Sequence, residues 1–173
     1  MKLIGKHIVL YLPSEEDIDT IVQWENDPAH WLVSDTVVPY TKEQITEFVL
    51  HNQDVYETGQ LRLMIFSSDK EERMGCIDLF DFDPKNRRVG IGILVDHNYR
   101  GKGLAHEALE MLVEYCSKGL EMHSVYAEVL ETNTSSIRLF ESVGFALSGT
   151  RKDWLWDGEK YQDQFIYQKV LAG

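Results

Sequence analysis

The feature that most constrains the fold is a glycine-bearing segment at residues 100–105, with the sequence Arg-Gly-Lys-Gly-Leu-Ala. Residues 89–95 before it are apolar and partly β-branched, which predicts a strand. Apolar side chains then recur at helical spacing, which predicts a long helix. They are Leu104, Ala108, Met111, Leu112 and Tyr115. Because glycine lets the backbone approach a ligand and a helix N-terminus presents N–H groups to an anion, the segment predicts a pyrophosphate-binding turn.

Two common phosphate-binding loops do not match this segment. The dinucleotide fingerprint Gly-x-Gly-x-x-Gly would need a glycine where His106 stands. The P-loop would need Ser or Thr directly after Lys102, where the chain has Gly103. Both nucleotide-binding interpretations therefore lose a residue on which their chemistry depends.

The rest of the chain alternates strand-like and helical patterns, which predicts an α/β (α+β) fold. Turn residues separate three successive strands, so we expect an antiparallel meander there. Strands are expected at residues 7–12, 61–66, 74–82, 89–95 and 125–130, with a closing pair near 145 and 165–170. Helices are expected after Ser14, after Thr41, after Gly103 and at residues 135–143.

Length and composition predict a single domain over residues 1–173, with 43% hydrophobic and 27% charged residues. The formal net charge of -12 opposes binding to nucleic acid and favours cationic partners. Two cysteines are too few for a disulfide framework, and no apolar run approaches the about 20 residues of a membrane span. We therefore expect a cytoplasmic protein that binds neither nucleic acid nor membrane.

Two ordered motifs resemble the GNAT superfamily of N-acetyltransferases. The family signature Gln/Arg-x-x-Gly-x-Gly/Ala is matched by Arg100, Gly103 and Ala105. Residues 133–145, from an Asn to an aromatic-Glu-x-x-Gly-Phe sequence, are similar to the family's second element. The closing residues 158–163 resemble those of bacterial spermidine and ribosomal-protein N-terminal acetyltransferases, so the resemblance extends over nearly the whole chain.

This resemblance implies a mixed, mostly antiparallel sheet of six to seven strands with a central splay, flanked by about four helices. It also implies acetyl-CoA as cosubstrate, with its pantetheine arm between residues 89–95 and 125–130. The expected cofactor-binding residues are Leu94, Val95, Arg100, Gly101, Lys102, Gly103, Leu104, Ala105 and Asn133.

The same resemblance assigns a catalytic role to Glu128, the glutamate of a Glu-Val-x-x-x-Asn pattern. An alkyl amine has a pKa of about 10.4, so a proton acceptor is useful at neutral pH. A main-chain N–H of residues 89–95 is expected to polarise the thioester carbonyl. Two positions depart from the family: Phe140 replaces a tyrosine that could protonate the thiolate, and Gly90 replaces a glutamate.

Several of these side chains also have a purely structural interpretation. Glu128 could equally be a solvated strand carboxylate, and Phe140 and Phe145 are expected to pack in the core. Trp24, Trp31 and Tyr40 either line an acceptor pocket or pack between helices. The acidic group Asp78, Asp81 and Asp83 is interpreted as a solvated turn, and His97, His106 and His123 lack the spacing of a metal site, so no metal is predicted.

Three functions remain open at this stage. The leading hypothesis is an acetyl-CoA-dependent N-acetyltransferase acting on a primary amine, of a spermidine-like or spermine-like polyamine or of a protein N-terminus. The second is a catalytically weak acyl-CoA-binding module, because Phe140 and Gly90 replace ionisable groups. The third is a scaffold, and assembly into a homodimer or larger homo-oligomer is left open.

Overall fold

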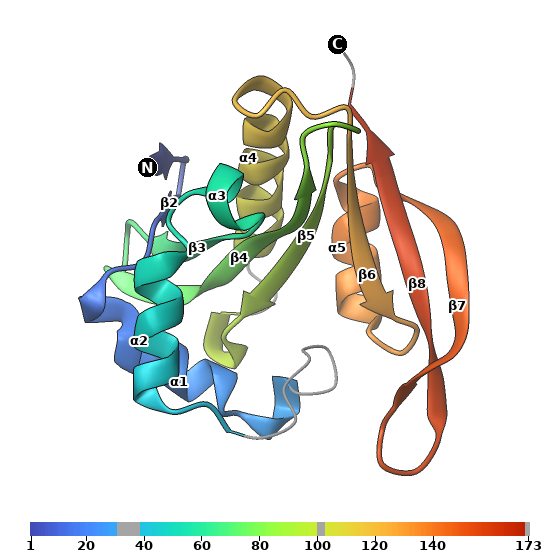
Figure 1. Cartoon of the computed structure of the whole chain (residues 1–173), viewed down its shortest axis with the longest axis horizontal. Coiled ribbons are helices and arrows are strands. Elements are labelled where there is room, and N and C mark those ends of the chain that lie inside the picture. Colours follow the sequence, from blue (N-terminus) through green and yellow to red (C-terminus); the bar gives the residue numbers. More distant parts are fainter. Residues whose placement is uncertain (31–38, 100–102, 172–173) are drawn as a thin grey trace.

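The computed structural model describes residues 1–30, 39–99 and 103–171, and these form one eight-stranded sheet with helices on both faces (Figure 1). The strands lie in the order β1-β2-β3-β4-β5-β6-β8-β7. Neighbouring strands are antiparallel except β5 and β6, which are parallel. Their bounds are β1 Lys2–Ile4, β2 Ile8–Tyr11, β3 Leu61–Ser67, β4 Glu72–Asp83, β5 Arg88–Val95, β6 Ser124–Leu130, β7 Ala146–Trp156 and β8 Tyr161–Val170.

Five α-helices and three short 3-10 helices lie within the described ranges. The α-helices are α1 Ile18–Glu25, α2 Lys42–His51, α3 Val55–Thr58, α4 Leu104–Lys118 and α5 Thr134–Ser142. The 3-10 helices are Glu15–Asp17, Pro28–His30 and His97–Tyr99. None of the helices described is long and apolar enough to cross a membrane.

The alternation of side chains along β3 builds two separate cores. Leu61, Leu63 and Ile65 belong to a large cluster that includes the apolar faces of α4 and α5. Met64 points the other way, into a smaller cluster with apolar residues of α1 and α2. Helices α4 and α5 therefore pack on one face of the central strands of the sheet, while α1 and α2 pack on the opposite face of its first half (Figure 1).

The parallel pairing of β5 with β6 is short. It joins Arg88 to Ser124, Val89 to Val125 and Gly90 to Tyr126, and within the described chain it extends no further. Beyond these residues the strands diverge into a wedge, while β5 stays paired with β4 and β6 with β8 (Figure 1). The predicted central splay is therefore present, between the two strands that the sequence named.

Local sequence signals position most elements as predicted. Thr41 accepts a hydrogen bond from the backbone N–H of Gln44, and the Gln44 side chain accepts one from that of Thr41, so the predicted cap of α2 is confirmed. The helix predicted after Ser14 begins as a 3-10 turn in which Asp17 accepts from the Ser14 N–H. The structure adds β1 and α3, which the sequence analysis missed, so the sheet has eight strands rather than six or seven.

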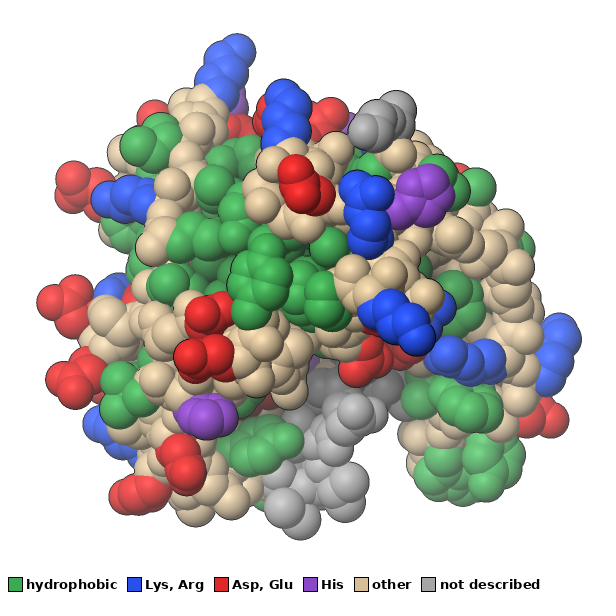
Figure 2. Space-filling model, turned by 45° about the horizontal axis from the view of Figure 1, so that its top comes forward, with side chains coloured by type: hydrophobic (Ala, Val, Ile, Leu, Met, Phe, Trp, Pro, Cys, Tyr) green, Lys and Arg blue, Asp and Glu red, His purple; other side chains and the backbone are tan. Residues whose placement is uncertain are grey.

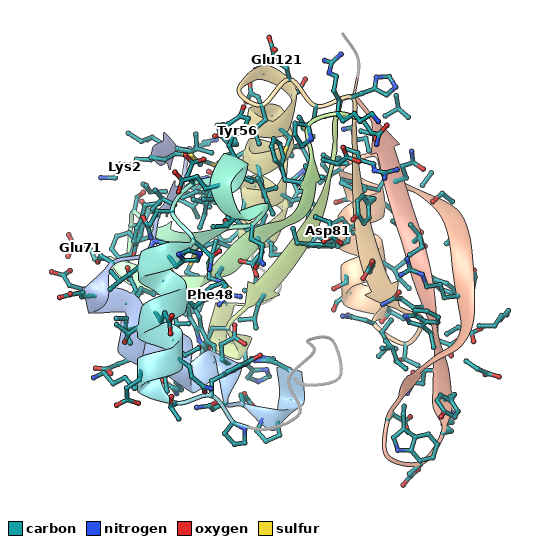
Figure 3. The ribbon with its side chains drawn as sticks, viewed as in Figure 1. Lys2, Phe48, Tyr56, Glu71, Asp81 and Glu121 are labelled. Atoms are coloured by element: carbon teal, nitrogen blue, oxygen red, sulfur yellow. The ribbon has the colours of Figure 1, made fainter. Side chains whose placement is uncertain are left out.

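A partly buried ion cluster ties α1 to the sheet. Arg62 of β3 donates from Nε and Nη2 to the two carboxylate oxygens of Asp78 on β4, at 2.9 and 2.8 Å, and from Nη1 to Glu25 of α1 at 2.6 Å. Its guanidinium also lies 5.4 Å from the ring centroid of Phe48, which reaches from α2 toward the sheet (Figure 3). Burial alone lowers the pKa of Arg62, but the charges of Asp78 and Glu25 hold it well above its ordinary value.

Removing this guanidinium is expected to be costly, because Asp78 and Glu25 would both lose their hydrogen bonds to it. We predict that Arg62→Met lowers the free energy of unfolding by about 3 kcal/mol. The control is Lys42→Met, which removes an exposed cation 3.0 Å from Asp19 and should cost less than about 1 kcal/mol. Urea unfolding followed by tryptophan fluorescence measures both, and equal losses in the two variants would contradict the structural role of the cluster.

Candidate active site

The wedge between β5 and β6 exposes backbone on both inner edges. Residues 91–95 of β5 pair with β4 on one side, and residues 127–130 of β6 pair with β8 on the other. On the inner edges of residues 91–94 and 127–129, backbone N–H and C=O groups face the opening between the two strands, where an extended ligand with amide groups could pair with them. The wedge therefore fits a chain such as the pantetheine arm.

The start of α4 follows the end of β5 and has the geometry of an anion site. Gly103 is the N-cap residue, with φ 73° and ψ 2°, and an added Cβ would meet no atom within 4 Å. Leu104 and Ala105 are the first two residues of the helix, so their N–H groups have no acceptor within it. The described part of the predicted pyrophosphate turn thus fits that ligand, while Arg100, Gly101 and Lys102 lie outside the described residues.

The other predicted cofactor residues border the wedge. Leu94 and Val95 are half-buried at the end of β5, opposite Cys76 and Gly75 of β4. Asn133 lies just beyond β6 and caps α5, because its side-chain carbonyl oxygen accepts from the Ser136 N–H at 3.2 Å. Since capping uses this oxygen, the side-chain NH₂ group is the part of Asn133 that can donate to a ligand.

Glu128 lies on β6 with its side chain on the face away from α4 and α5, because its neighbours Ala127 and Val129 are buried in the large core. Its carboxylate oxygen is 3.2 Å from Nη1 of Arg151 on β7. The same Nη1 donates to Oε1 of Gln164 on β8 at 2.5 Å. The predicted catalytic carboxylate is therefore solvent-accessible and, in this structure, engaged by an arginine.

An aromatic pair fills the base of the wedge. The rings of Phe80 on β4 and Tyr126 on β6 meet edge to face, with centroids 5.7 Å apart. Burial raises the pKa of Tyr126, and the negative charges of Asp81 and Glu128 raise it further, whereas Arg88 opposes them. Asp81 of β4 lies beside this region (Figure 3). Two carboxylates, Asp81 and Glu128, thus act on the ring hydroxyl where β5 and β6 separate.

Phe80 explains why position 90 lacks a side chain. Gly90 is buried, and an added Cβ would lie 2.4 Å from the Phe80 ring. A glutamate at this position would have to displace that ring. Phe140 is likewise buried and packs edge to face on Phe145, with centroids 5.1 Å apart, which confirms the predicted core role of both.

The acidic group predicted as a solvated turn is not one unit. Asp78 is bound by Arg62 within the sheet, Asp83 accepts from the Asn86 N–H in the β4–β5 turn, and Asp81 sits with φ 48° at an irregularity of β4. The interpretation was wrong for Asp78, because its partner comes from another strand.

The aromatic residues suggested for an acceptor pocket are also divided. Trp24 is buried in the smaller core and donates from Nε1 to Asp96 at 3.1 Å, whereas Tyr40 is 38% exposed. Trp31 lies outside the described residues. Over the ranges described, no histidine, cysteine or carboxylate cluster is arranged to hold a metal ion.

The two cysteines offer no nucleophile. Burial raises the pKa of both Cys76 and Cys116 to about 12, so their thiols stay protonated at neutral pH.

Sequence reasoning missed Arg62, Tyr126 and Arg151 as neighbours of this site. Each reaches its partners across strands, so no local motif marks it. A charged residue inside the apolar pattern of β3 was the one available signal for Arg62.

The sequence matches the family described as "Acetyltransferase (GNAT) domain" over residues 7–146. The chain belongs to the GNAT acetyltransferase family. An uncharacterized N-acetyltransferase p20 of Bacillus licheniformis is 30% identical over 141 residues, covering 80% of this chain and 79% of the relative. The ribosomal-protein-serine acetyltransferase of Escherichia coli K12 is 22% identical, covering 97% of this chain and 95% of the relative.

A solved GNAT structure has the same fold. The spermidine N-acetyltransferase of Vibrio cholerae, crystallised with CoA and spermine, aligns with a TM-score of 0.84 at 19% identity. The alignment covers 96% of each chain. The predicted GNAT fold is therefore confirmed, and the chain is an N-acetyltransferase.

The packing at position 90 can be tested with two neighbouring glycines of β5. We predict that Gly90→Ala lowers the free energy of unfolding by about 1–3 kcal/mol, because the new methyl group overlaps Phe80. Gly92→Ala is the matched control, since its Cβ would lie 4.0 Å from the same ring. Thermal or urea unfolding compares the two, and Phe80→Leu should recover part of the loss. Equal stability of the two alanine variants would refute the steric explanation.

Proposed function

We propose that this protein transfers the acetyl group of acetyl-CoA to a primary amine of a small cationic acceptor of the polyamine type. Among GNAT enzymes, acetyl-CoA supplies an activated acetyl thioester. In this chain, the start of α4 would hold the pyrophosphate and the wedge between β5 and β6 would hold the pantetheine arm. The acceptor would then approach from the face of β6 that carries Glu128.

The observation that carries this proposal is the negative charge on the acceptor side of the sheet. Asp81 and Glu128 both act on Tyr126, at the point where β5 and β6 separate. The nearby cluster adds two carboxylates, Glu25 and Asp78, which both pair with the guanidinium of Arg62. Such a surface attracts an alkylammonium ion, in agreement with the net charge of -12.

Transfer requires the acceptor nitrogen to lose a proton. Glu128 is the proposed proton acceptor, directly or through one water, because it is an exposed carboxylate on the strand that borders the wedge. A backbone N–H on the inner edge of β5 would donate to the thioester oxygen as negative charge develops there. The leaving thiolate needs no strong acid, since a Cys-like thiol has a pKa of about 8.5, and Phe140 has no proton to give.

A second acceptor class, the N-terminus of a protein, is supported by one observation. The pattern from Glu128 to Asn133 is the one shared with ribosomal-protein N-terminal acetyltransferases, and the Escherichia coli relative matches nearly the whole chain. Both acceptors are primary amines, so the same chemistry serves either.

The proposed function is tested by coenzyme A release from acetyl-CoA. The panel holds spermidine, spermine, putrescine, aminoglycosides, amino acids and N-terminal peptides, with each acetylated product confirmed by mass. Selective turnover of polyamines supports the proposal, and selective turnover of peptides supports the second class instead. Coenzyme A binding without turnover of any acceptor would favour an acyl-CoA-binding module.

We predict that Glu128→Gln lowers kcat/KM by about 10²- to 10⁴-fold, because the amide cannot accept the amine proton. The affinity for coenzyme A should change little, since Glu128 faces the acceptor side. Steady-state kinetics and calorimetric titration with coenzyme A separate the two effects. An unchanged kcat/KM would remove Glu128 from catalysis.

We predict that Gly103→Val weakens coenzyme A binding by about tenfold, because its side chain would cover the amides at the start of α4. The matched control is Gly59→Val at the end of α3, where the backbone is nearly identical at φ 73° and ψ 3° and no atom lies near the added Cβ. Both variants place valine in the same left-handed backbone conformation, so the free energy of unfolding should fall by the same amount in each. Equal coenzyme A affinity in the two variants would exclude the α4 start as the pyrophosphate site.

A further inference from the structure

Arg151 occupies a seat built from three kinds of group that bind cations. Its Nη1 lies 3.2 Å from the Glu128 carboxylate and donates to the Gln164 amide oxygen at 2.5 Å. Its guanidinium carbon is 5.3 Å from the ring centroid of Trp154. A carboxylate, a neutral oxygen and an indole face are groups that hold an alkylammonium or guanidinium ion. We call these three residues, Glu128, Gln164 and Trp154, the cation seat.

An irregularity in β7 brings Trp154 to this seat. Residues three apart in a regular strand point to opposite faces, so Arg151 and Trp154 would not touch. Here β7 advances from Arg151 to Leu155 while β8 advances only from Gln164 to Gln162, which is a bulge. Asp153 inside it has φ 48°, in the left-handed region. The bulge turns the Trp154 ring onto the guanidinium.

Asp163 of β8 holds this bulge in place. Its carboxylate accepts the Asp153 N–H at 2.9 Å and pairs with Lys152 at 2.9 Å. These contacts lower the pKa of Asp163, the backbone hydrogen bond first and Lys152 second. The contacts of Asp163 therefore hold the bulge that carries Trp154, and none of them involves Arg151.

The side chain of Arg151 is partly open to solvent. Arg151 has 40% of its side chain exposed, and Glu128 has 33% exposed. Trp154 is 56% exposed, on a hairpin where hydrophobic side chains gather at the surface (Figure 2). A long side chain at this degree of exposure can leave toward solvent without opening the core.

The pairing conflicts with the role proposed for Glu128. A carboxylate held by a guanidinium has its negative charge balanced and is a poorer partner for a second cation. While Arg151 is in place, an acceptor ammonium finds the charge already neutralised. The acceptor can use Glu128 fully only after Arg151 has moved away.

We propose that Arg151 occupies the position that the positively charged group of the acceptor takes when it binds. The acceptor then binds by displacing Arg151 from the cation seat of Glu128, Gln164 and Trp154. Arg151 is then a specificity-determining residue, because it competes intramolecularly and excludes weakly cationic amines. This inference rests on the proposed function, since it names the subsite where a polyamine-like acceptor is recognised.

The test is Arg151→Ala, with spermidine as the acceptor. The KM for spermidine should fall about three- to tenfold, because the competing ion pair and its ring contact are gone. The affinity for coenzyme A should stay within twofold. Methylguanidinium should inhibit Arg151→Ala competitively against spermidine and leave the wild type unaffected, because the emptied seat fits the lost group. Adding Trp154→Ala should raise the KM again.

The control is Lys118→Met, which removes a cation from the exposed end of α4, where Lys118 pairs with Glu114. It changes the net charge equally and should leave the KM unchanged. A KM for spermidine that is unchanged or higher in Arg151→Ala, with native thermal stability, overturns the inference alone. Free lysine is tested as a second acceptor, because it carries a carboxylate that spermidine lacks. If Arg151→Ala raises the KM for lysine alone, Arg151 recognises an anion, and this result also overturns the inference. If the wild type acetylates no diamine or polyamine, the proposed function fails and the inference fails with it.

Discussion

The wedge in the sheet depends on the short pairing between β5 and β6. Among the residues that the structure describes, three pairs connect these parallel strands, between Arg88–Gly90 and Ser124–Tyr126, and they link the two halves of the sheet. Each strand keeps an antiparallel partner on its outer side, so the divergence does not unravel the sheet. The inner edges instead present backbone groups to the opening, where an extended ligand can pair with them. The divergence of the two strands and the proposed cofactor site are therefore the same structural feature.

Local signals predicted most of the fold because the elements around the wedge are specified locally. The cap at Thr41, the glycine at 103 and the apolar spacing along α4 are all read within a few residues of chain. The strand β1 was missed because three residues carry no detectable alternation, and α3 because its four residues depend on Asp54 and Gly59 at its ends. Short elements take their structure from neighbours that a sequence window does not contain.

The site was predictable where it follows a motif and not where it depends on pairing across strands. The sequence placed Glu128, Asn133 and the start of α4 on the elements where the structure has them. It gave no sign that Arg151 would contact Glu128, because register and a bulge in β7 decide that contact. Asp78 was misread for the same reason, since Arg62 lies on a different strand. The pairing of strands decides which charged side chains meet across the sheet, whereas caps and turns are decided by residues within one short segment.

The replacement of glutamate by Gly90 also changes where acid–base chemistry can occur. In the space above Gly90 lies the Phe80 ring, which packs against Tyr126 and makes the base of the wedge apolar on the β5 side. The carboxylates near the wedge then come from β4 and β6, as Asp81 and Glu128. In the proposed function, an acceptor amine would meet the carboxylates of Asp81 and Glu128 first. It would then meet the aromatic rings of Phe80 and Tyr126 where β5 and β6 separate. Under the proposed function, the ammonium ion would bind at Glu128 first and the neutral amine would move toward the thioester afterwards, because an apolar environment disfavours the charged form.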